Sequence, residues 1–150
     1  MTTKEKIEQD YVREVKARNE SAVSMLRMIR AALKNAEIEK RSPLEEEDVI
    51  AVLNQEMKKL NDSLDSFTQA GRQDLVAKTG GEREILKAYL PDQMDDDELD
   101  ELIRRTVEEA GEVTEKDFGR LMGMVMKQAK NRADGTKVSA MLKKMLAGDG

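Results

Sequence analysis

Cysteine and histidine are both absent from this sequence. Without cysteine, the chain can form no disulfide, no thiolate nucleophile and no cysteine metal site. Without histidine, it has no imidazole for acid–base chemistry and no imidazole ligand for zinc or iron. Ser21, Ser63 and Ser139 have no base to activate them as nucleophiles. We therefore predict no catalytic residue, no metal ligand and no cofactor.

Long apolar runs are also missing. No segment approaches the roughly 20 apolar residues that a membrane-spanning helix needs. The first residues, Met1 to Glu5, lead directly into charged sequence without the apolar region of a secretory signal. We therefore expect a cytoplasmic protein that does not contact a membrane.

The composition is typical of amphipathic helices. Charged residues make up 38% of the 150 residues and apolar residues 39%, which is too apolar for a disordered chain and too polar for one large core. Apolar residues recur at helical spacing, and no segment shows a convincing strand period. The longest apolar seam alternates by four and three and comprises Val49, Leu53, Met57, Leu60, Leu64 and Phe67. The sequence predicts an all-α protein.

Turn and capping residues divide the chain into seven predicted helices. Thr3 is the predicted N-cap of the first helix and Asn19 that of the second. Gly80 and Gly81 fall inside the fourth helix, where we expect local weakness or a kink. Pro91 ends that helix, and the composition changes after it. The approximate ranges are 4–17, 20–40, 44–70, 72–90, 96–110, 115–130 and 137–146.

Charge is unevenly distributed along the chain. The net charge of −5 argues against a general nucleic-acid binder. Residues 92–117 contain 12 acidic and 3 basic residues, whereas residues 118–150 contain 7 basic and 2 acidic residues. The acidic run from Asp95 lacks the spacing and the glycine of an EF-hand, so helix N-terminal charge explains it better than a metal site.

Two groups of basic residues are candidates for contact with a polyanion. Solvated surface paired with neighbouring acids is the commoner explanation of each group, and the sequence leaves both interpretations open. The C-terminal group comprises Arg120, Lys127, Lys130, Arg132, Lys137, Lys143 and Lys144. The secondary group comprises Arg27, Arg30, Lys34 and Arg41, at i, i+3, i+7 and i+14 along one stripe of the second predicted helix.

Two glycines lie close in sequence to Arg120 of the C-terminal basic group. Gly119 and Gly123 are four residues apart beside Arg120, but they do not belong to a phosphate-binding loop motif. Their spacing favours a close approach between two helices.

Several segments together resemble the YqeY family. They are GRQDLVAK at 71–78 followed by Glu82, Leu86 and the YLP at 89–91, LRMIRAALKNAEIEK at 26–40, DFGRLMGMVM at 117–126 and NRADGTKVSAMLKKML at 131–146. The resemblance extends from about Ile7 to Leu146. One departure is that the family usually has an acidic residue after Lys78, where this chain has Thr79, Gly80 and Gly81.

The resemblance implies an all-helical protein with a larger N-terminal domain of about four helices, residues 1–91, and a three-helix C-terminal domain, residues 92–150. The C-terminal domain is similar to the tail of GatB, a subunit of the glutamine-dependent aspartyl/glutamyl-tRNA amidotransferase. In that enzyme the tail contacts tRNA, and domains that this chain lacks perform the amide chemistry.

Three functions follow as hypotheses. The first is a non-catalytic tRNA-binding or accessory module that contacts tRNA or a tRNA-processing enzyme through the basic groups. With 3% aromatic residues, such a module would read RNA shape and backbone more than stacked bases. The second is a protein-interaction module without nucleic-acid contact. The third, which rests on family kinship only, is a carbon–nitrogen ligase with glutamine as amido-N-donor.

Overall fold

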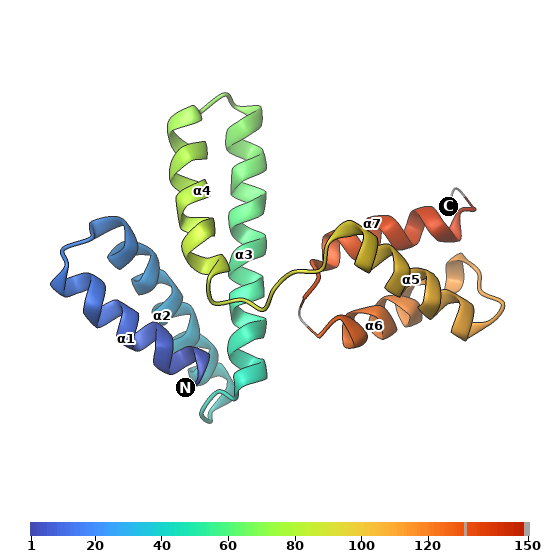
Figure 1. The fold of residues 1–150 in the computed structure, drawn as a ribbon, viewed down its shortest axis with the longest axis horizontal. Helices are drawn as coiled ribbons and strands as arrows, with labels where there is room; N and C mark the ends of the chain where they lie inside the picture. Colours follow the sequence, from blue (N-terminus) through green and yellow to red (C-terminus); the bar gives the residue numbers. More distant parts are fainter. Residues whose placement is uncertain (131, 149–150) are drawn as a thin grey trace. The chain divides into compact units, whose positions relative to one another are not determined.

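The structure is a computed structural model that describes residues 1–130 and 132–148 (Figure 1). Within that part of the chain every regular element is helical, which confirms the predicted all-α fold. The elements are α1 (Thr3–Lys16), α2 (Glu20–Lys40), α3 (Glu46–Gln69), α4 (Gln73–Lys87), α5 (Asp96–Ala110), the 3-10 turn η1 (Glu115–Asp117), α6 (Phe118–Ala129) and α7 (Gly135–Leu146). They form two compact units, Met1–Leu90 and Pro91–Gly150.

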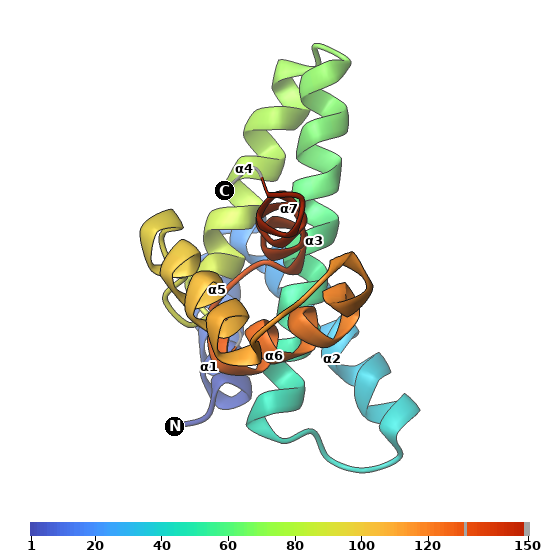
Figure 2. The same ribbon diagram turned by 90° about the vertical axis from the view of Figure 1, so that its right-hand side faces the viewer.

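The N-terminal unit consists of two helical hairpins, α1 with α2 and α3 with α4. Helices α3 and α4 lie side by side in both ribbon views (Figures 1 and 2). Each fully buried aliphatic side chain stabilises the unit by about 1.5–3 kcal/mol relative to exposure. The core consists of Ile7, Met25, Leu26, Ile29, Leu33, Val49, Ile50, Leu53, Leu60 and Leu86. The predicted seam of α3 therefore supplies part of this core: Val49, Leu53 and Leu60 are buried and Met57 packs against them, whereas Leu64 and Phe67 are half-buried outside the core.

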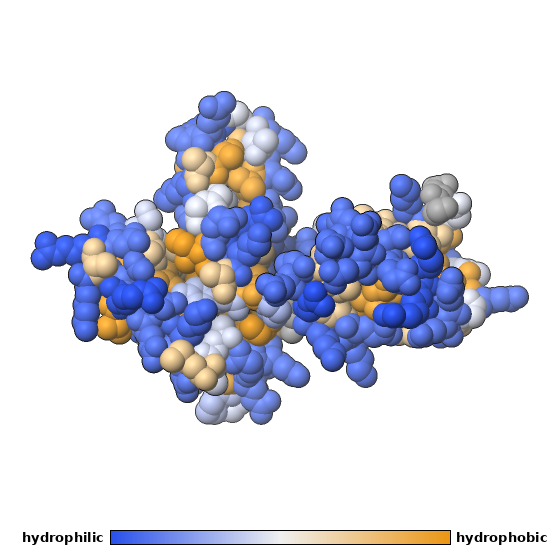
Figure 3. Space-filling model, in the orientation of Figure 1, coloured by the Kyte–Doolittle hydropathy of each residue, from blue (hydrophilic) through white to orange (hydrophobic). Residues whose placement is uncertain are grey.

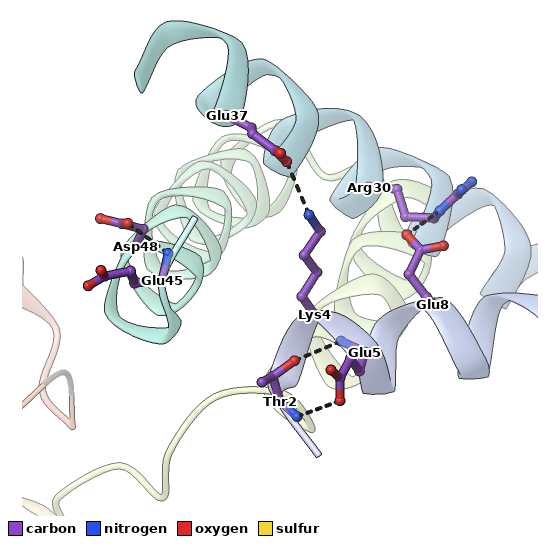
Figure 4. Close-up of polar contacts among 8 residues, drawn as sticks. All are labelled: Thr2, Lys4, Glu5, Glu8, Arg30, Glu37, Glu45 and Asp48. Carbon is purple, nitrogen blue, oxygen red and sulfur yellow. Dashed lines mark hydrogen bonds and ion pairs between the residues drawn. The ribbon is translucent and has the colours of Figure 1, made fainter. Parts of the chain in front are cut away.

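Side-chain caps begin the first two helices. Thr2 accepts a hydrogen bond at Oγ1 from the Glu5 backbone N–H, and the Thr2 N–H donates to the Glu5 carboxylate, each at 3.2 Å (Figure 4). The prediction of Thr3 as N-cap is therefore wrong by one residue, because Glu5 completes the reciprocal pair with Thr2. Asn19 caps α2 as predicted, with Oδ1 at 3.3 Å from the Ala22 N–H.

Helix α4 runs without interruption through Gly80 and Gly81. A Cβ atom at either glycine would meet no atom within 4 Å, so packing does not require glycine there. The preceding residue, Thr79, is only 5% exposed. A threonine hydroxyl costs less to bury at this position than a carboxylate would.

The C-terminal unit is a three-helix arrangement with its own core. Half-buried methionines from α6 and α7 pack around this core. The core consists of Leu99, Leu102, Ile103, Leu121, Val125, Ala129, Ala133, Val138 and Leu142. Gly119 and Gly123 are exposed on α6, and a Cβ at either would meet nothing within 4 Å. The expectation that they allow a close helix approach is therefore wrong.

The surface reflects the amphipathic pattern of the helices. Most of the face in Figure 3 is hydrophilic, with hydrophobic residues in smaller patches between helices. In the part of the chain that the structure describes, no helix has both the length and the apolar character required to cross a bilayer.

Candidate functional site

A groove of about 770 Å³ on the N-terminal unit is lined by five cationic side chains. We call it the basic groove. It is lined by Lys4, Glu8, Arg27, Arg30, Ala31, Leu33, Lys34, Glu37, Ile38, Arg41, Ser42 and Pro43. The five cationic and two acidic side chains give it a net charge of +3, in a protein whose net charge is −5.

Helical periodicity accounts for most of this lining. Helix α2 buries the stripe that contains Leu26, Ile29 and Leu33 in the core of the unit. The adjoining face carries the secondary basic group, Arg27, Arg30, Lys34 and Arg41. The structure therefore brings all four residues of that group to one groove. Lys4, the fifth cation, comes from α1 and was not among the predicted site residues.

Two ion pairs connect α1 to α2 across the groove (Figure 4). Lys4 Nζ lies 3.1 Å from Glu37 Oε2, and Arg30 Nε lies 2.8 Å from Glu8 Oε1. The four side chains are between 37% and 47% exposed, so each pair contributes only about 0–1 kcal/mol to stability. Their larger effect is on the groove, because the carboxylates neutralise two of its five cations.

Tyr11 fixes the positions of two arginines. The Arg30 guanidinium lies over the Tyr11 ring at 4.2 Å from its centroid, and Arg27 Nε donates to the Tyr11 hydroxyl at 3.3 Å. That hydrogen bond from Arg27 is the largest cause of a lowered pKa for Tyr11. The hydrogen bond to Glu8 raises the pKa of Arg30 above its usual value. Tyr11 therefore holds both guanidinium groups in place.

Lys34 and Arg41 are the free cations of the groove. Both are exposed, and neither side chain has an ion-pair or hydrogen-bond partner among residues 1–130 and 132–148. Arg41 ends α2 in the left-handed conformation, with φ of 62°. An anion that enters the groove can therefore contact Lys34 and Arg41 without breaking an existing pair.

Four cations of the C-terminal group are already engaged. Arg132 pairs with Glu98 at 3.3 Å and donates to the Asp92 carbonyl at 2.8 Å, and Lys137 pairs with Asp96. Helix α5 thus supplies carboxylates that neutralise two of the cations that were predicted to contact phosphates. The other engaged cations are Arg120, which is 3.4 Å from Asp117, and Lys143, which lies 5.5 Å from the Phe118 ring centroid.

The remaining C-terminal candidates are Lys127, Lys130 and Lys144. They are exposed and have no charged partner within the described residues; the neighbouring Asn131 lies outside those residues. Lys127 and Lys130 lie at the end of α6, and Lys144 lies in the last turn of α7. The groove on the N-terminal unit is therefore the more concentrated site of positive charge.

Comparison with known proteins identifies relatives over nearly the whole chain. The family model described as "Yqey-like protein" matches residues 4–146. The chain is 25% identical over 144 residues to "Altered inheritance of mitochondria protein 41, mitochondrial" of Pyrenophora tritici-repentis (strain Pt-1C-BFP), covering 94% of this chain and 79% of that protein. Because that relative is named as mitochondrial, a cytoplasmic location for this chain stays a prediction.

Proposed function

The chain belongs to the YqeY-like protein family, and from that premise we propose that it is a non-catalytic module that binds tRNA through the basic groove. Its role would be accessory to tRNA-dependent amidation, in keeping with the resemblance of its C-terminal unit to the tail of GatB. Lys127, Lys130 and Lys144 would make weaker, secondary phosphate contacts.

The observation that carries the proposal is the concentration of positive charge in the groove. Association with RNA is dominated by phosphate neutralisation, which a protein with a net charge of −5 can achieve only where cations gather locally. Five cations line one groove, and two of them, Lys34 and Arg41, have no partner among the described residues. Phosphates can therefore bind there without large rearrangement.

Charge reversal tests the proposal. The double variant K34E/R41E removes both free cations, and K58E/R83E is its matched control because Lys58 and Arg83 are exposed cations of the same unit outside the groove. Both variants change the net charge by the same amount. Fluorescence anisotropy with labelled tRNA, at several salt concentrations, measures the affinity of each.

We expect K34E/R41E to weaken binding strongly and to reduce the slope of log K against log salt by about 0.7–0.9 for each lost phosphate contact. The control should retain most of the wild-type affinity. Equal losses in the two variants would show that net charge, and not the groove, determines binding.

The two other hypotheses predict different results. A protein-interaction module would retain a protein partner after nuclease treatment and would fail to bind tRNA even at low salt. A carbon–nitrogen ligase would require turnover of glutamine and ATP by the purified chain.

A further inference from the structure

The basic groove is lined by exposed apolar side chains as well as by cations. Ile38 is 65% exposed and lies on α2 between Lys34 and Arg41, four residues after one and three before the other. Ala31 and Pro43 also line the groove. The two free cations therefore flank an uncovered aliphatic side chain within one concavity, and a ligand with only phosphates would leave that side chain in water.

The apolar side chains of the groove favour an unpaired strand over a duplex. A volume of about 770 Å³ is large enough for one compact ligand. An A-form duplex presents phosphates and 2′-hydroxyls across a broad minor groove, and its bases are stacked inside. An unpaired nucleotide instead exposes a flat, largely apolar base beside its phosphate. The base matches the exposed side chain of Ile38, and the phosphates match Lys34 and Arg41 on either side of it.

Tyr11 does not provide the base-binding surface. One face of its ring is covered by the Arg30 guanidinium at 4.2 Å, and its hydroxyl is occupied by Arg27. The base would therefore rest on Ile38 and Pro43, contacts that any base can make. Such contacts would discriminate little between base sequences and more between unpaired and paired strands.

We propose that the basic groove binds an unpaired RNA segment, with a base on Ile38 and Pro43 and the flanking phosphates on Lys34 and Arg41. This inference rests on the proposed function and specifies which part of an RNA the groove would hold. It assigns Ile38, an apolar residue, a role in recognition that charge alone does not supply.

Three probes and two variants test this inference. The probes are a short single-stranded oligouridylate, the same strand paired with oligoadenylate, and inorganic polyphosphate, which has the charge without the base. The variants are I38S and V12S. Val12 is a matched control because it is 50% exposed on α1 and lies outside the groove. Both substitutions replace exposed side chains, so the fold should tolerate them.

We expect the single strand to bind more tightly than the duplex at equal ionic strength. The I38S variant should weaken single-strand binding by about fivefold to tenfold, which corresponds to loss of one aliphatic contact surface. It should leave polyphosphate binding unchanged, and V12S should change neither.

Equal affinity for single strand and duplex, or no effect of I38S on the single strand, would overturn this inference. In that case K34E/R41E could still lower tRNA affinity, and the proposed function would stand. If no RNA binds the wild-type chain even at low salt, both the inference and the proposed function fail.

Discussion

Removing the two carboxylates of the basic groove should make the protein a stronger RNA binder. In the double variant E8Q/E37Q, Lys4 loses its partner at 3.1 Å and Arg30 loses its partner at 2.8 Å. Arg30 stays over the Tyr11 ring, so its guanidinium remains in the groove. The groove then has five cations and no carboxylate, and its net charge rises from +3 to +5.

The expected size of the effect follows from counter-ion release. Each additional phosphate contact steepens the dependence of log K on log salt by about 0.7–0.9, so two contacts steepen it by about 1.4–1.8. Between 200 mM and 50 mM salt, the ratio of variant to wild-type affinity should therefore grow by roughly 7- to 12-fold. The stability change should be small, about 0–2 kcal/mol in total, because both lost pairs are partly exposed.

Anisotropy titrations with labelled tRNA at several salt concentrations measure this ratio, and thermal unfolding checks that the variant is folded. The control is E47Q/E84Q, which removes two exposed carboxylates of the same unit that do not line the groove. An unchanged salt slope for E8Q/E37Q would refute the reasoning. An equal gain for the control would show that the carboxylates act through net charge and not through the groove.

Two further predictions concern the stability of the N-terminal unit. The substitution Gly81→Ala should raise the free energy of unfolding by about 0.5–1 kcal/mol in urea titrations, because Gly81 is inside α4 and a Cβ there would meet no atom within 4 Å. The substitution Gly71→Ala should instead lower it, because Gly71 has φ of +70°. The substitution Tyr89→Phe should lower it by about 1.5–3 kcal/mol near neutral pH, because the Tyr89 hydroxyl donates to Asp10 Oδ2 at 2.5 Å. Burial of Tyr89, and secondly its hydrogen bond to Asp10, raises the pKa of Tyr89 above 10. The stability that this group contributes is therefore complete below about pH 10 and is lost as the pH rises further. The Tyr89→Phe variant should not show this loss. A wild-type alkaline profile identical to that of Tyr89→Phe would contradict this account of Tyr89.

Local sequence patterns were sufficient to predict the all-α fold, the first part of the α3 seam and the position of Arg27, Arg30, Lys34 and Arg41 along one side of α2. These features depend on helical periodicity, which a single segment reveals. Lys4 was missed because its place in the groove depends on how α1 packs against α2. The engagement of Lys137 likewise depends on where α5 lies relative to α7, and that of Arg132 on where α5 lies relative to the segment before α7.

The spacing of Gly119 and Gly123 was misread for a related reason. Glycines four residues apart share one helix face whether that face meets another helix or solvent, and only the tertiary structure distinguishes the two cases. The Thr3 cap was wrong by one residue because adjacent threonines offer two possible hydroxyls, and Glu5 pairs with the first.

The left-handed backbone of Arg41 has a consequence for anyone who engineers this protein. Most residue types pay about 1–2 kcal/mol to adopt that conformation, whereas glycine adopts it freely. A search for heat-resistant variants would therefore enrich glycine at position 41 and, in doing so, remove a cation of the groove that has no partner among the described residues. Selection for stability would favour glycine at position 41, whereas selection for ligand affinity would favour arginine there.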